Sequence, residues 1–433
     1  MTYQQTIEFL YSSTPVFERV GASAYKEGLD NTKALDDFLN NPHRKYKTIH
    51  IAGTNGKGST SHTLAAVLQS AGLRVGLYTS PHLVDFRERI RVNGIPVSEQ
   101  YVVDFVEKVS DFIMPLHPSF FELTTAMAFK YFEEEHVDVA VIEVGLGGRL
   151  DCTNIIQPVL SVITNISFDH TGFLGDTLEK IAREKAGIIK SCTPVVIGEY
   201  TAETKPVFEE KAKQLQAPLV FAQDGGHGKV IPEFQLKGAC QRHNAVTILT
   251  ACKELERMGI LPESIDDDNG AEKSPVVEGF AHVCDLTGLR GRWEKISDSP
   301  LVICDTGHNL AGWQYLAGQI VKVYEERKAI DTQSSLRIVF GMVDDKDIHS
   351  VLSLLPHYAK YYFCQATTHR AIPAEKVAQM ANGCGLYGES YCSVKEAYVK
   401  AKTESSSSDF IFVGGSSYVV ADLLTFLLTV KDL

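Results

Sequence analysis

The chain has 433 residues, of which 44% are hydrophobic, and its formal net charge is −12. This length exceeds that of one ordinary domain, so we expect two or three domains with sizeable cores. The acidic balance argues against general nucleic-acid binding, although a local basic cleft could still hold an anionic substrate.

The nine cysteines are scattered and never form a C-x-x-C motif, which favours reduced thiols over a disulfide framework or a zinc site. No stretch approaches the roughly 18 apolar residues of a membrane span, and the N-terminal residues lack a signal-peptide pattern. We therefore expect a cytoplasmic protein that binds neither membrane nor nucleic acid, and we expect it to be a monomer.

A glycine-rich loop follows the apolar run at residues 48–52 and precedes a segment of helical periodicity at residues 63–69. Strand, glycine loop, lysine, hydroxyl pair and helix is the layout of a phosphate-binding loop. Lys57 supplies a positive charge for phosphates, and the hydroxyl of Ser59 or Thr60 can reach Mg²⁺. The spacing G-x-x-G-K-G-[ST] departs from the common G-x-x-x-x-G-K-[ST], and a glycine turn that only caps a helix is the alternative. The predicted nucleotide-binding residues here are Gly53, Thr54, Asn55, Gly56, Lys57, Gly58, Ser59 and Thr60.

Residues 74–80 predict a second strand, which ends at Ser80 and is followed by Pro81 and His82. Ligands of open α/β sheets lie beyond the carboxyl ends of the strands, so Ser80 is placed to be a ligand. The segment from Arg87 to Gly94 alternates charged and apolar residues. It is either a solvated strand or a rim that attracts anions.

Two further strands are predicted at residues 137–144 and 159–166. The first carries Glu143 near its end, where a buried carboxylate needs a cation or a salt-bridge partner. The second ends just before Asp169 and His170. His170 thus falls at the same sheet edge as Ser59, Ser80 and Glu143, which favours it as a metal ligand.

The glycine-rich segment 145–151 forms a second loop that contains Arg149 and Asp151. A helix is predicted over residues 177–190, and by its pattern Lys185 is an ordinary helix lysine paired with an acid such as Glu184 or Glu179. Another helix begins near residues 236–245 and carries Asn244.

A polar, turn-rich surface loop is predicted at residues 266–275, and a domain boundary follows near residue 297. The strand at residues 300–304 ends at Asp305, close to His308, and further strands follow at βαβ spacing. The sequence therefore predicts an α/β protein. A P-loop-type domain with a mostly parallel sheet spans residues 1–296, and a smaller Rossmann-like α/β domain spans residues 297–433.

The glycine loop resembles the ATP loop of folylpolyglutamate synthases and dihydrofolate synthases, within the Mur-ligase superfamily. The run Glu184-Lys185-Ala186-Gly187-Ile188 is similar to the segment of that family with a carbamylated lysine. Residues 236–245 resemble the segment whose asparagine, here Asn244, approaches the nucleotide base, but Cys240 stands where the family has histidine. Arg292 and the run from Asp305 to Asn309 resemble two motifs of the C-terminal domain. The resemblance extends from about residue 45 to the C-terminus, with the motifs in the order of the family.

The resemblance implies ATP and Mg²⁺ as cofactors and a carbamylated Lys185. It implies a metal site at Ser59, Ser80, Glu143 and His170, and nucleotide contacts that extend to Asn244, Arg292 and Asp305. The implied catalytic residues are Lys57, His170, Lys185, Asp305 and His308. The implied acceptor-binding residues are Ser80, Pro81, His82, Arg87, Arg149 and Asp151.

The activity that the resemblance implies is ATP-dependent amide formation. A folate or dihydropteroate carboxylate is activated as an acyl phosphate and is then attacked by the amine of L-glutamate. A ligase acting on a nucleotide-linked wall precursor is a second interpretation, but the short segment before the glycine loop leaves little room for a separate UDP-binding domain. An ATP-binding switch without enzymatic activity is a third. Whether the acceptor is dihydropteroate, a reduced folate or both stays open.

Overall fold

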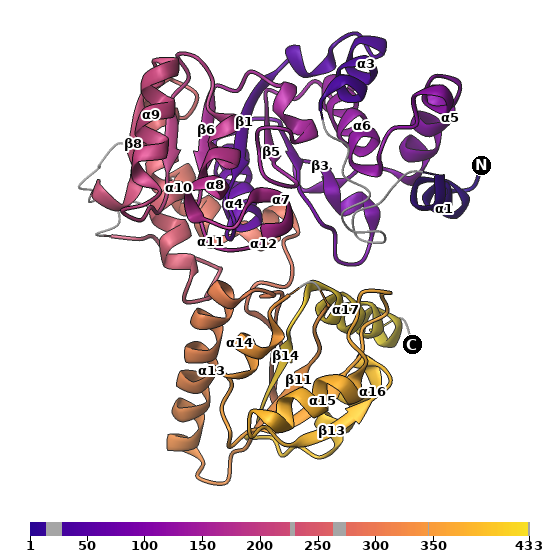
Figure 1. Ribbon diagram of the computed structural model, residues 1–433, viewed down its shortest axis with the longest axis vertical. Coiled ribbons are helices and arrows are strands. Elements are labelled where there is room, and N and C mark those ends of the chain that lie inside the picture. Colours follow the sequence, from indigo (N-terminus) through magenta and orange to yellow (C-terminus); the bar gives the residue numbers. More distant parts are fainter. Residues whose placement is uncertain (14–27, 226–229, 263–273, 345, 432–433) are drawn as a thin grey trace. The chain divides into compact units, whose positions relative to one another are not determined.

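The computed structural model describes residues 1–13, 28–225, 230–262, 274–344 and 346–431, and it divides into two compact units (Figure 1). Unit 1 comprises Met1–Gln235 and Gln241–Leu289, and unit 2 comprises Leu236–Cys240 and Arg290–Leu433. The predicted boundary near residue 297 is wrong, because it falls inside the strand β9 (Glu294–Asp298). That strand pairs with β10 (Leu301–Asp305) of unit 2, so the boundary lies before Arg290. The surface loop predicted at residues 266–275 lies almost entirely outside the described residues.

Unit 1 is built on a sheet with the strand order β4-β3-β2-β5-β1-β6-β7-β8. The strands β2, β5, β1, β6, β7 and β8 run parallel, and β3 and β4 add an antiparallel edge, so the predicted mostly parallel sheet is confirmed. The strand bounds are β1 Lys47–Ala52, β2 Val75–Tyr78, β3 Ile90–Val92, β4 Ile95–Pro96, β5 Val139–Glu143, β6 Leu160–Ile163, β7 Val195–Ile197 and β8 Leu219–Phe221.

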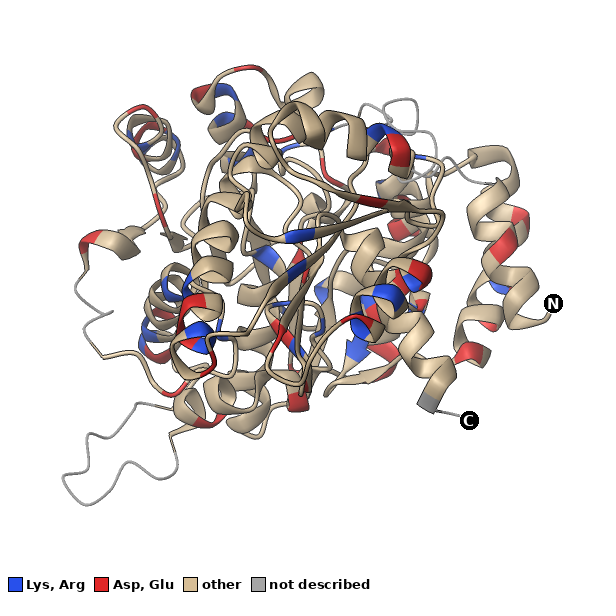
Figure 2. Cartoon of the chain, turned by 90° about the horizontal axis from the view of Figure 1, so that it is seen from below, with Lys and Arg blue, Asp and Glu red and all other residues tan. Residues whose placement is uncertain are grey.

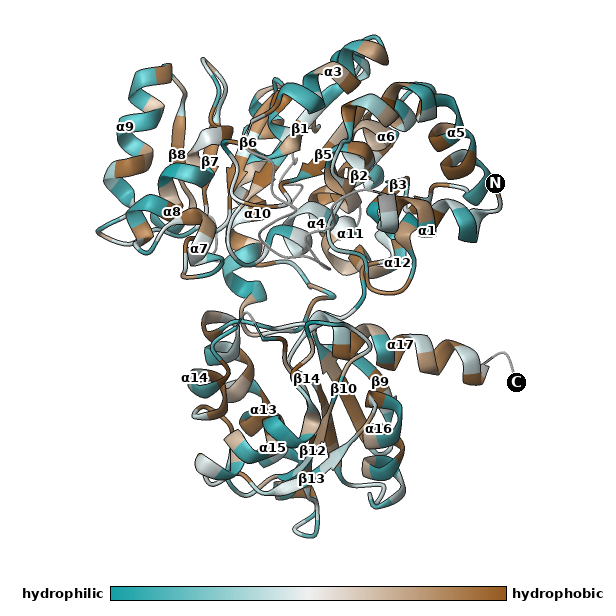
Figure 3. Ribbon diagram, turned by 45° about the vertical axis from the view of Figure 1, so that its right-hand side comes forward, coloured by the Kyte–Doolittle hydropathy of each residue, from teal (hydrophilic) through white to brown (hydrophobic). Residues whose placement is uncertain are grey.

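Helices flank this sheet and bury its apolar strands, which are brown in Figure 3. The α-helices of unit 1 are α1 Tyr3–Ser13, α3 Asp30–Phe38, α4 Lys57–Ser70, α5 Glu99–Leu116, α6 Phe120–Glu134, α7 Thr171–Leu174, α8 Leu178–Lys185, α9 Lys205–Leu215, α10 Gln241–Arg257, α11 Pro275–Ala281 and α12 Val283–Thr287. The 3-10 helices are η2 Pro42–Arg44, η3 Phe86–Arg89, η4 Cys152–Ile155, η5 Ala186–Ile188 and η6 Ala222–Asp224. Among the helices of the described residues, none is both long enough and apolar enough to cross a membrane.

Two predicted elements of unit 1 differ from the structure. The predicted helix 177–190 changes to a 3-10 turn after Lys185, where a Cβ at Gly187 would lie 2.3 Å from the Cα of Arg149. The segment from Arg87 to Gly94 begins as the 3-10 helix η3 and only then becomes β3. Asp85 caps η3 together with Glu88, which accounts for the helical turn.

Unit 2 is a smaller α/β unit whose sheet has the order β13-β12-β11-β14-β10-β9. All neighbouring strands are parallel except β9, so the predicted Rossmann-like arrangement is confirmed with an antiparallel edge. The remaining elements are α13 Leu310–Ile330, β11 Leu336–Phe340, α14 Ile348–Leu352, β12 Lys360–Cys364, α15 Ala374–Gly383, β13 Gly388–Tyr391, α16 Val394–Thr403, β14 Phe410–Gly414 and α17 Ser417–Lys431.

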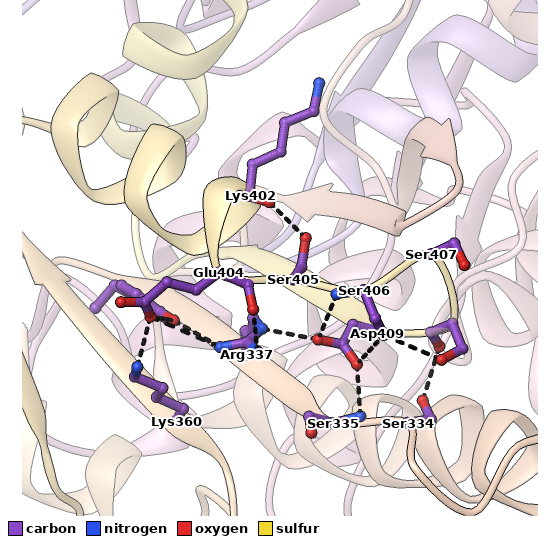
Figure 4. A network of polar contacts seen from close by, with 12 residues as sticks. Ser334, Ser335, Arg337, Lys360, Lys402, Glu404, Ser405, Ser406, Ser407 and Asp409 are labelled. Atoms are coloured by element: carbon purple, nitrogen blue, oxygen red, sulfur yellow. Dashed lines mark hydrogen bonds and ion pairs between the residues drawn. The ribbon is translucent and has the colours of Figure 1, made fainter.

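Charged residues of both signs are interspersed along the helices (Figure 2), and several form ion pairs one helical turn apart, such as Lys130 with Glu133. A buried polar network also holds the amino ends of the strands in unit 2 (Figure 4). Arg337 of β11 donates from Nε to Asp409 Oδ2 at 2.9 Å and from NH1 to the hydroxyl of Tyr362 at 2.8 Å. Burial acts to raise the pKa of Asp409, but hydrogen bonds from the Ser335 backbone and from Arg337 outweigh it, so the pKa lies below its ordinary value.

We expect Arg337→Met to lower the free energy of unfolding by about 3 kcal/mol, because it leaves the Asp409 carboxylate buried without its cation. Urea unfolding followed by circular dichroism measures this change. Lys360→Met is the matched control, because its ion pair with Glu404 is largely exposed and should matter far less. Equal losses in the two variants would contradict the role given to Arg337.

Candidate active site

Two glycines shape the loop between β1 and α4. Gly53 has φ +146° and Gly56 has φ +84°, a region that favours glycine. A Cβ at Gly53 would lie 1.8 Å from Thr164 Oγ1, and a Cβ at Gly56 would lie 2.2 Å from Asn244 Oδ1. Both positions therefore require glycine for conformation and for space.

The segment after β6 holds this loop in place. Thr164 Oγ1 donates to the Asn55 carbonyl at 2.6 Å, and the Asn55 backbone N–H donates to Asn165 Oδ1 at 3.0 Å. The hydroxyl of Thr54 donates to the Ser167 carbonyl at 3.1 Å. Residues 164–167 were predicted only as the end of a strand, although polar residues directly after a buried strand were a usable signal.

Two lysine amines meet at the Gly53 carbonyl oxygen. Lys57 Nζ donates to it at 3.2 Å and also to the Thr54 carbonyl at 3.3 Å, and Lys185 Nζ donates to it at 2.9 Å. Lys185 is only 4% exposed, so it is not the ordinary helix lysine that its local pattern indicated. Burial, followed by the positive charge of Lys57, lowers the pKa of Lys185 to about 7. A substantial fraction of the Lys185 amine is therefore neutral near pH 7.

The hydroxyls at the start of α4 are buried. Ser59 Oγ accepts from Gln241 Nε2 at 3.2 Å, and Asn244 Nδ2 donates to Gln241 Oε1 at 2.8 Å. Thr60 Oγ1 finds no hydrogen-bond partner among the described residues. Gln241 and Asn244 thus bring the start of α10 against the glycine loop.

Of the predicted metal ligands, Ser80 and Glu143 are joined directly. Glu143 is the last residue of β5, is 3% exposed, and accepts from the Ser80 backbone N–H at 3.4 Å. His170 directly precedes the short helix α7 and has φ +48°, and its backbone N–H donates to Asp169 Oδ1 at 2.9 Å. The part of the chain that the structure describes holds no group of three or more His, Cys, Asp or Glu side chains suited to a metal ion. The predicted set, with its two serines, is not such a group.

Arg87 is paired within its own loop. Its guanidinium contacts both carboxylate oxygens of Asp85, with Nε–Oδ1 at 3.0 Å and NH2–Oδ2 at 2.8 Å, and Glu99 lies 3.6 Å away. Hydrogen bonding to Asp85 raises the pKa of Arg87 further. Two carboxylates thus offset the charge of Arg87 and stabilise its loop, and its predicted contact with an anionic acceptor stays a prediction.

His82, on the same loop, has a defined tautomer. Arg89 Nε donates to His82 Nδ1 at 2.7 Å, so that ring nitrogen carries no proton. His82 Nε2 therefore carries the hydrogen and donates to the Tyr11 hydroxyl at 3.2 Å. Arg89 is itself buried and lies over the ring of Phe120, 5.1 Å from its centre. Through these contacts, the guanidinium of Arg89 and the aromatic side chains of Tyr11 and Phe120 lie around His82.

The loop at residues 145–151 packs on the end of α8. Asp151 is buried and accepts from the Leu146 backbone N–H at 2.8 Å and from the Thr153 hydroxyl at 2.5 Å. Burial raises the pKa of Asp151. Asp151 thus caps its own loop, and its predicted substrate contact stays a prediction. Arg149 pairs with Glu184 at 3.0 Å on the rim of a small pocket of about 100 Å³ lined by Leu146, Gly147, Arg149, Leu150, Phe173, Leu174 and Glu184.

The predicted residues of unit 2 also form a cluster. Asp305, at the end of β10, accepts from the backbone N–H groups of Trp293 at 2.7 Å and Gly307 at 2.8 Å. Burial raises the pKa of Asp305, against the opposing positive charge of Arg292. Arg292 donates to the hydroxyl of Thr306, whose carbonyl oxygen lies 3.2 Å from His308 Nδ1.

Family models match both units. The model of the Mur ligase middle domain matches residues 51–248, and the model of the Mur ligase glutamate ligase domain matches residues 291–417. Fold and site together thus define a Mur-type ligase.

Relatives narrow this class. A Bacillus subtilis (strain 168) dihydrofolate synthase/folylpolyglutamate synthase is 32% identical over 92% of this chain and 94% of its own length. The structure of Escherichia coli FolC in complex with DHPP and ADP is 28% identical, covers 100% of this chain and 99% of its own, and has a TM-score of 0.82. A bifunctional folylpolyglutamate synthase/dihydrofolate synthase with Mn, AMPPNP and L-glutamate bound is 29% identical, covers 99% and 98% of the two chains, and has a TM-score of 0.81.

The chain belongs to the dihydrofolate synthase/folylpolyglutamate synthase family, whose members are ATP-dependent glutamate ligases acting on folate.

We expect Lys185→Met to raise the midpoint of unfolding below pH 7, because the native chain there buries a charged amine at a cost in free energy. The pKa of Lys185 is lower in the native than in the unfolded state, so the stability of the unsubstituted chain rises with pH between about 7 and about 10. The advantage of the variant should therefore shrink over that range. Urea unfolding in CO₂-free buffer at several pH values measures it. The exposed Lys33→Met serves as control, and a pH-independent difference would contradict the native pKa of Lys185.

Proposed function

We propose that this chain catalyses the ATP-dependent addition of L-glutamate to the carboxylate of a folate or of dihydropteroate. The observation that carries the proposal is the meeting of Lys57 and Lys185 at the Gly53 carbonyl, inside a glycine loop at the start of a helix. This arrangement provides one amine for phosphate charge and one amine that burial makes chemically reactive. It occurs in a chain whose relatives are named for both activities.

The glycine loop fits a nucleotide. Its two glycines with positive φ bring backbone close to the start of α4, where the helix N-terminus and Lys57 favour phosphate. The buried, unpartnered hydroxyl of Thr60 is consistent with a polar ligand in this loop. Gly53, Thr54, Asn55, Gly56, Gly58, Ser59 and Asn244 complete the proposed ATP site. Bound ATP supplies the phosphoryl group that activates the acceptor carboxylate, and a divalent ion such as Mg²⁺ offsets its charge.

The fit to a divalent cation rests on oxygen donors at one edge of the sheet. Ser59 follows β1, while Ser80 and Glu143 follow or end the neighbouring strands β2 and β5 and touch each other. Hard cations prefer carboxylate and hydroxyl oxygens. We propose Ser59, Ser80, Glu143 and His170 as the metal-holding residues.

Lys185 is proposed to be carbamylated. Its neutral amine can attack CO₂, forming an N–C bond and releasing a proton, so that an uncharged amine next to Lys57 becomes an anion. The carbamate would attract the ammonium group of Lys57, whereas a protonated Lys185 would repel it. The carbamate also places a negative group where it supports the proposed metal site.

In unit 2, Arg292, Asp305 and His308 are proposed to contact nucleotide or to orient the attacking amine. On the acceptor side we propose Ser80, Pro81 and His82, because His82 has a fixed tautomer inside an aromatic wall suited to a flat ring. Arg87, Arg149 and Asp151 support their loops, and their predicted acceptor contacts stay predictions. Cytoplasmic location and a monomeric state stay predictions.

A phosphate-release assay tests the function. Dihydropteroate and tetrahydrofolate are offered separately, each with L-glutamate. Phosphate release that requires L-glutamate and one of these acceptors supports the proposal and identifies the acceptor. Release that requires a nucleotide-linked wall precursor would favour the second interpretation. ATP binding without turnover on any acceptor would favour the switch.

We expect Lys57→Ala to abolish glutamate-dependent phosphate release in a folded chain, with a loss of about a thousandfold or more, because it removes the positive charge that Lys57 places at the start of α4. Circular dichroism checks the fold. Lys33→Ala is the control for loss of a lysine charge. Near-normal activity in the folded Lys57→Ala variant would contradict the assignment of the loop.

We expect the intact protein to carry a carbamate on Lys185 near neutral pH, seen as a ¹³C resonance after exchange with ¹³C-bicarbonate. Lys185→Ala should lose the resonance and the ligase activity, and a short carboxylic acid should restore part of that activity by supplying the missing anion. An active wild-type enzyme without this resonance would contradict the modification.

A further inference from the structure

The chain passes between the two units three times, after Gln235, after Cys240 and after Leu289. At each passage a residue on the unit 1 side is hydrogen-bonded to α4, which begins at the glycine loop, or to α12, which packs on α4 (Figure 1). These anchors are all contacts within unit 1. The anchors of the first and third passages are not residues of the site described above. At the second passage, Gln241 contacts Ser59, which does belong to that site.

The first passage is anchored to α11 and α12. The Gln235 backbone N–H donates to the Phe280 carbonyl at 3.0 Å. Its side-chain Oε1 accepts from the Cys284 backbone N–H at 2.7 Å, and its Nε2 donates to Asp285 Oδ2 at 3.0 Å. One glutamine thus fixes the last residue of unit 1 before the chain leaves it.

The third passage is anchored to α4 itself. His62, in the second turn of α4, donates from Nδ1 to the Thr287 hydroxyl at 2.8 Å, and that hydroxyl donates to the Val283 carbonyl at 2.6 Å. Both side chains are buried, and Thr287 stands two residues before the last residue of this part of unit 1. The second passage precedes Gln241, which donates to Ser59 in the first turn of the same helix.

The helices α4, α11 and α12 are closely packed. A Cβ at Gly279 would lie 2.5 Å from the Val67 backbone nitrogen, so α11 meets the backbone of α4 directly. A Cβ at Gly94 of the β3–β4 turn would lie 2.0 Å from the Leu286 carbonyl of α12. α12 itself packs on α4 and is bonded to it through His62 and Thr287, so α11 and α12 both contact α4 directly.

We propose that His62, Gln235 and Thr287 are positioning residues that couple nucleotide at the glycine loop to the three connections of unit 2, and so to its placement during glutamate addition. The proposal rests on the proposed ligase function. The helix α4 starts at the proposed phosphate site and is hydrogen-bonded to residues next to the connections. A shift of its first turn is therefore transmitted to residues that bind no substrate. The competing account is that these bonds only stabilise α12.

Thr287→Val tests the coupling, because it removes the hydroxyl at nearly constant volume. We expect a dissociation constant for AMPPNP within about twofold of wild type, a kcat lower by about tenfold and a raised KM for glutamate. The change in radius of gyration on adding AMPPNP with the acceptor, measured by small-angle scattering, should shrink. Thr287→Ser, which keeps the hydroxyl, should restore all three quantities.

Thr250→Val is the matched control, because the Thr250 hydroxyl is also buried and donates one turn back to the Val246 carbonyl, within α10 only. It should leave kcat, KM and the scattering change at wild-type values. His62→Leu should add little in the Thr287→Val background, since both remove the same bond. If Thr287→Val fails to fold, Gln235→Met at a half-buried position is measured in its place, with the same expected split.

The coupling would be overturned if folded Thr287→Val or Gln235→Met kept the kcat, the KM and the scattering change of the wild type. It would also be overturned if Thr250→Val lost as much as Thr287→Val. A wild-type chain without glutamate-dependent phosphate release would contradict the proposed function instead. The scattering change with AMPPNP would then still decide the coupling, because it needs no turnover.

Discussion

The Gly53 carbonyl oxygen receives two lysine amines, and much of unit 1 is arranged around that contact. Two full positive charges at one buried carbonyl would repel each other strongly at the low dielectric of a protein interior. The arrangement is tolerable because burial and Lys57 together depress the pKa of Lys185. The site is therefore prepared either for an anion between the amines or for conversion of one amine into an anion.

The architecture that brings the amines together is a sheet edge. β1 places the glycine loop, the segment after β6 supplies Thr164 and Asn165, which hold it, and β5 ends in Glu143. Lys185 comes from the end of α8, where the absence of a Cβ at Gly148 and Gly187 allows the 145–151 loop to approach the helix backbone. The small residues around Lys185 are thus as necessary to its position as the charged ones are to its pKa.

Much of this edge could be predicted from sequence, because the carboxyl ends of parallel strands must meet. The contact between Ser80 and Glu143 follows from that rule alone. The burial of Lys185 could not be predicted from its helix pattern, since its partner carbonyl stands 132 residues away, and only the family resemblance singled it out. The predicted acceptor contacts of Arg87 and Asp151 stay predictions, but the sequence did contain a local reason for the contacts that these residues make in their own loops. Asp85 and Glu88 form a capping box, and Asp151 caps the 3-10 helix that contains Thr153. The carboxylates of Asp85 and Asp151 are therefore hydrogen-bonded within their own loops.

The residues next to the connections between the units differ from the site residues in their relation to the family models. The two family models end at residue 248 and begin again at residue 291, so α11 and α12 fall between them. The glycine loop and the Asp305 cluster lie within the matched parts, whereas Thr287 and its neighbours lie in the segment between. His62 joins the two, because it stands on the helix of the phosphate loop and bonds to the unmatched segment. Ligases of this architecture need the same phosphate chemistry, but each must hold its second unit through whatever segment its own chain supplies. On this proposal, the control of the position of unit 2 lies in α11 and α12, outside the residues proposed to bind ATP.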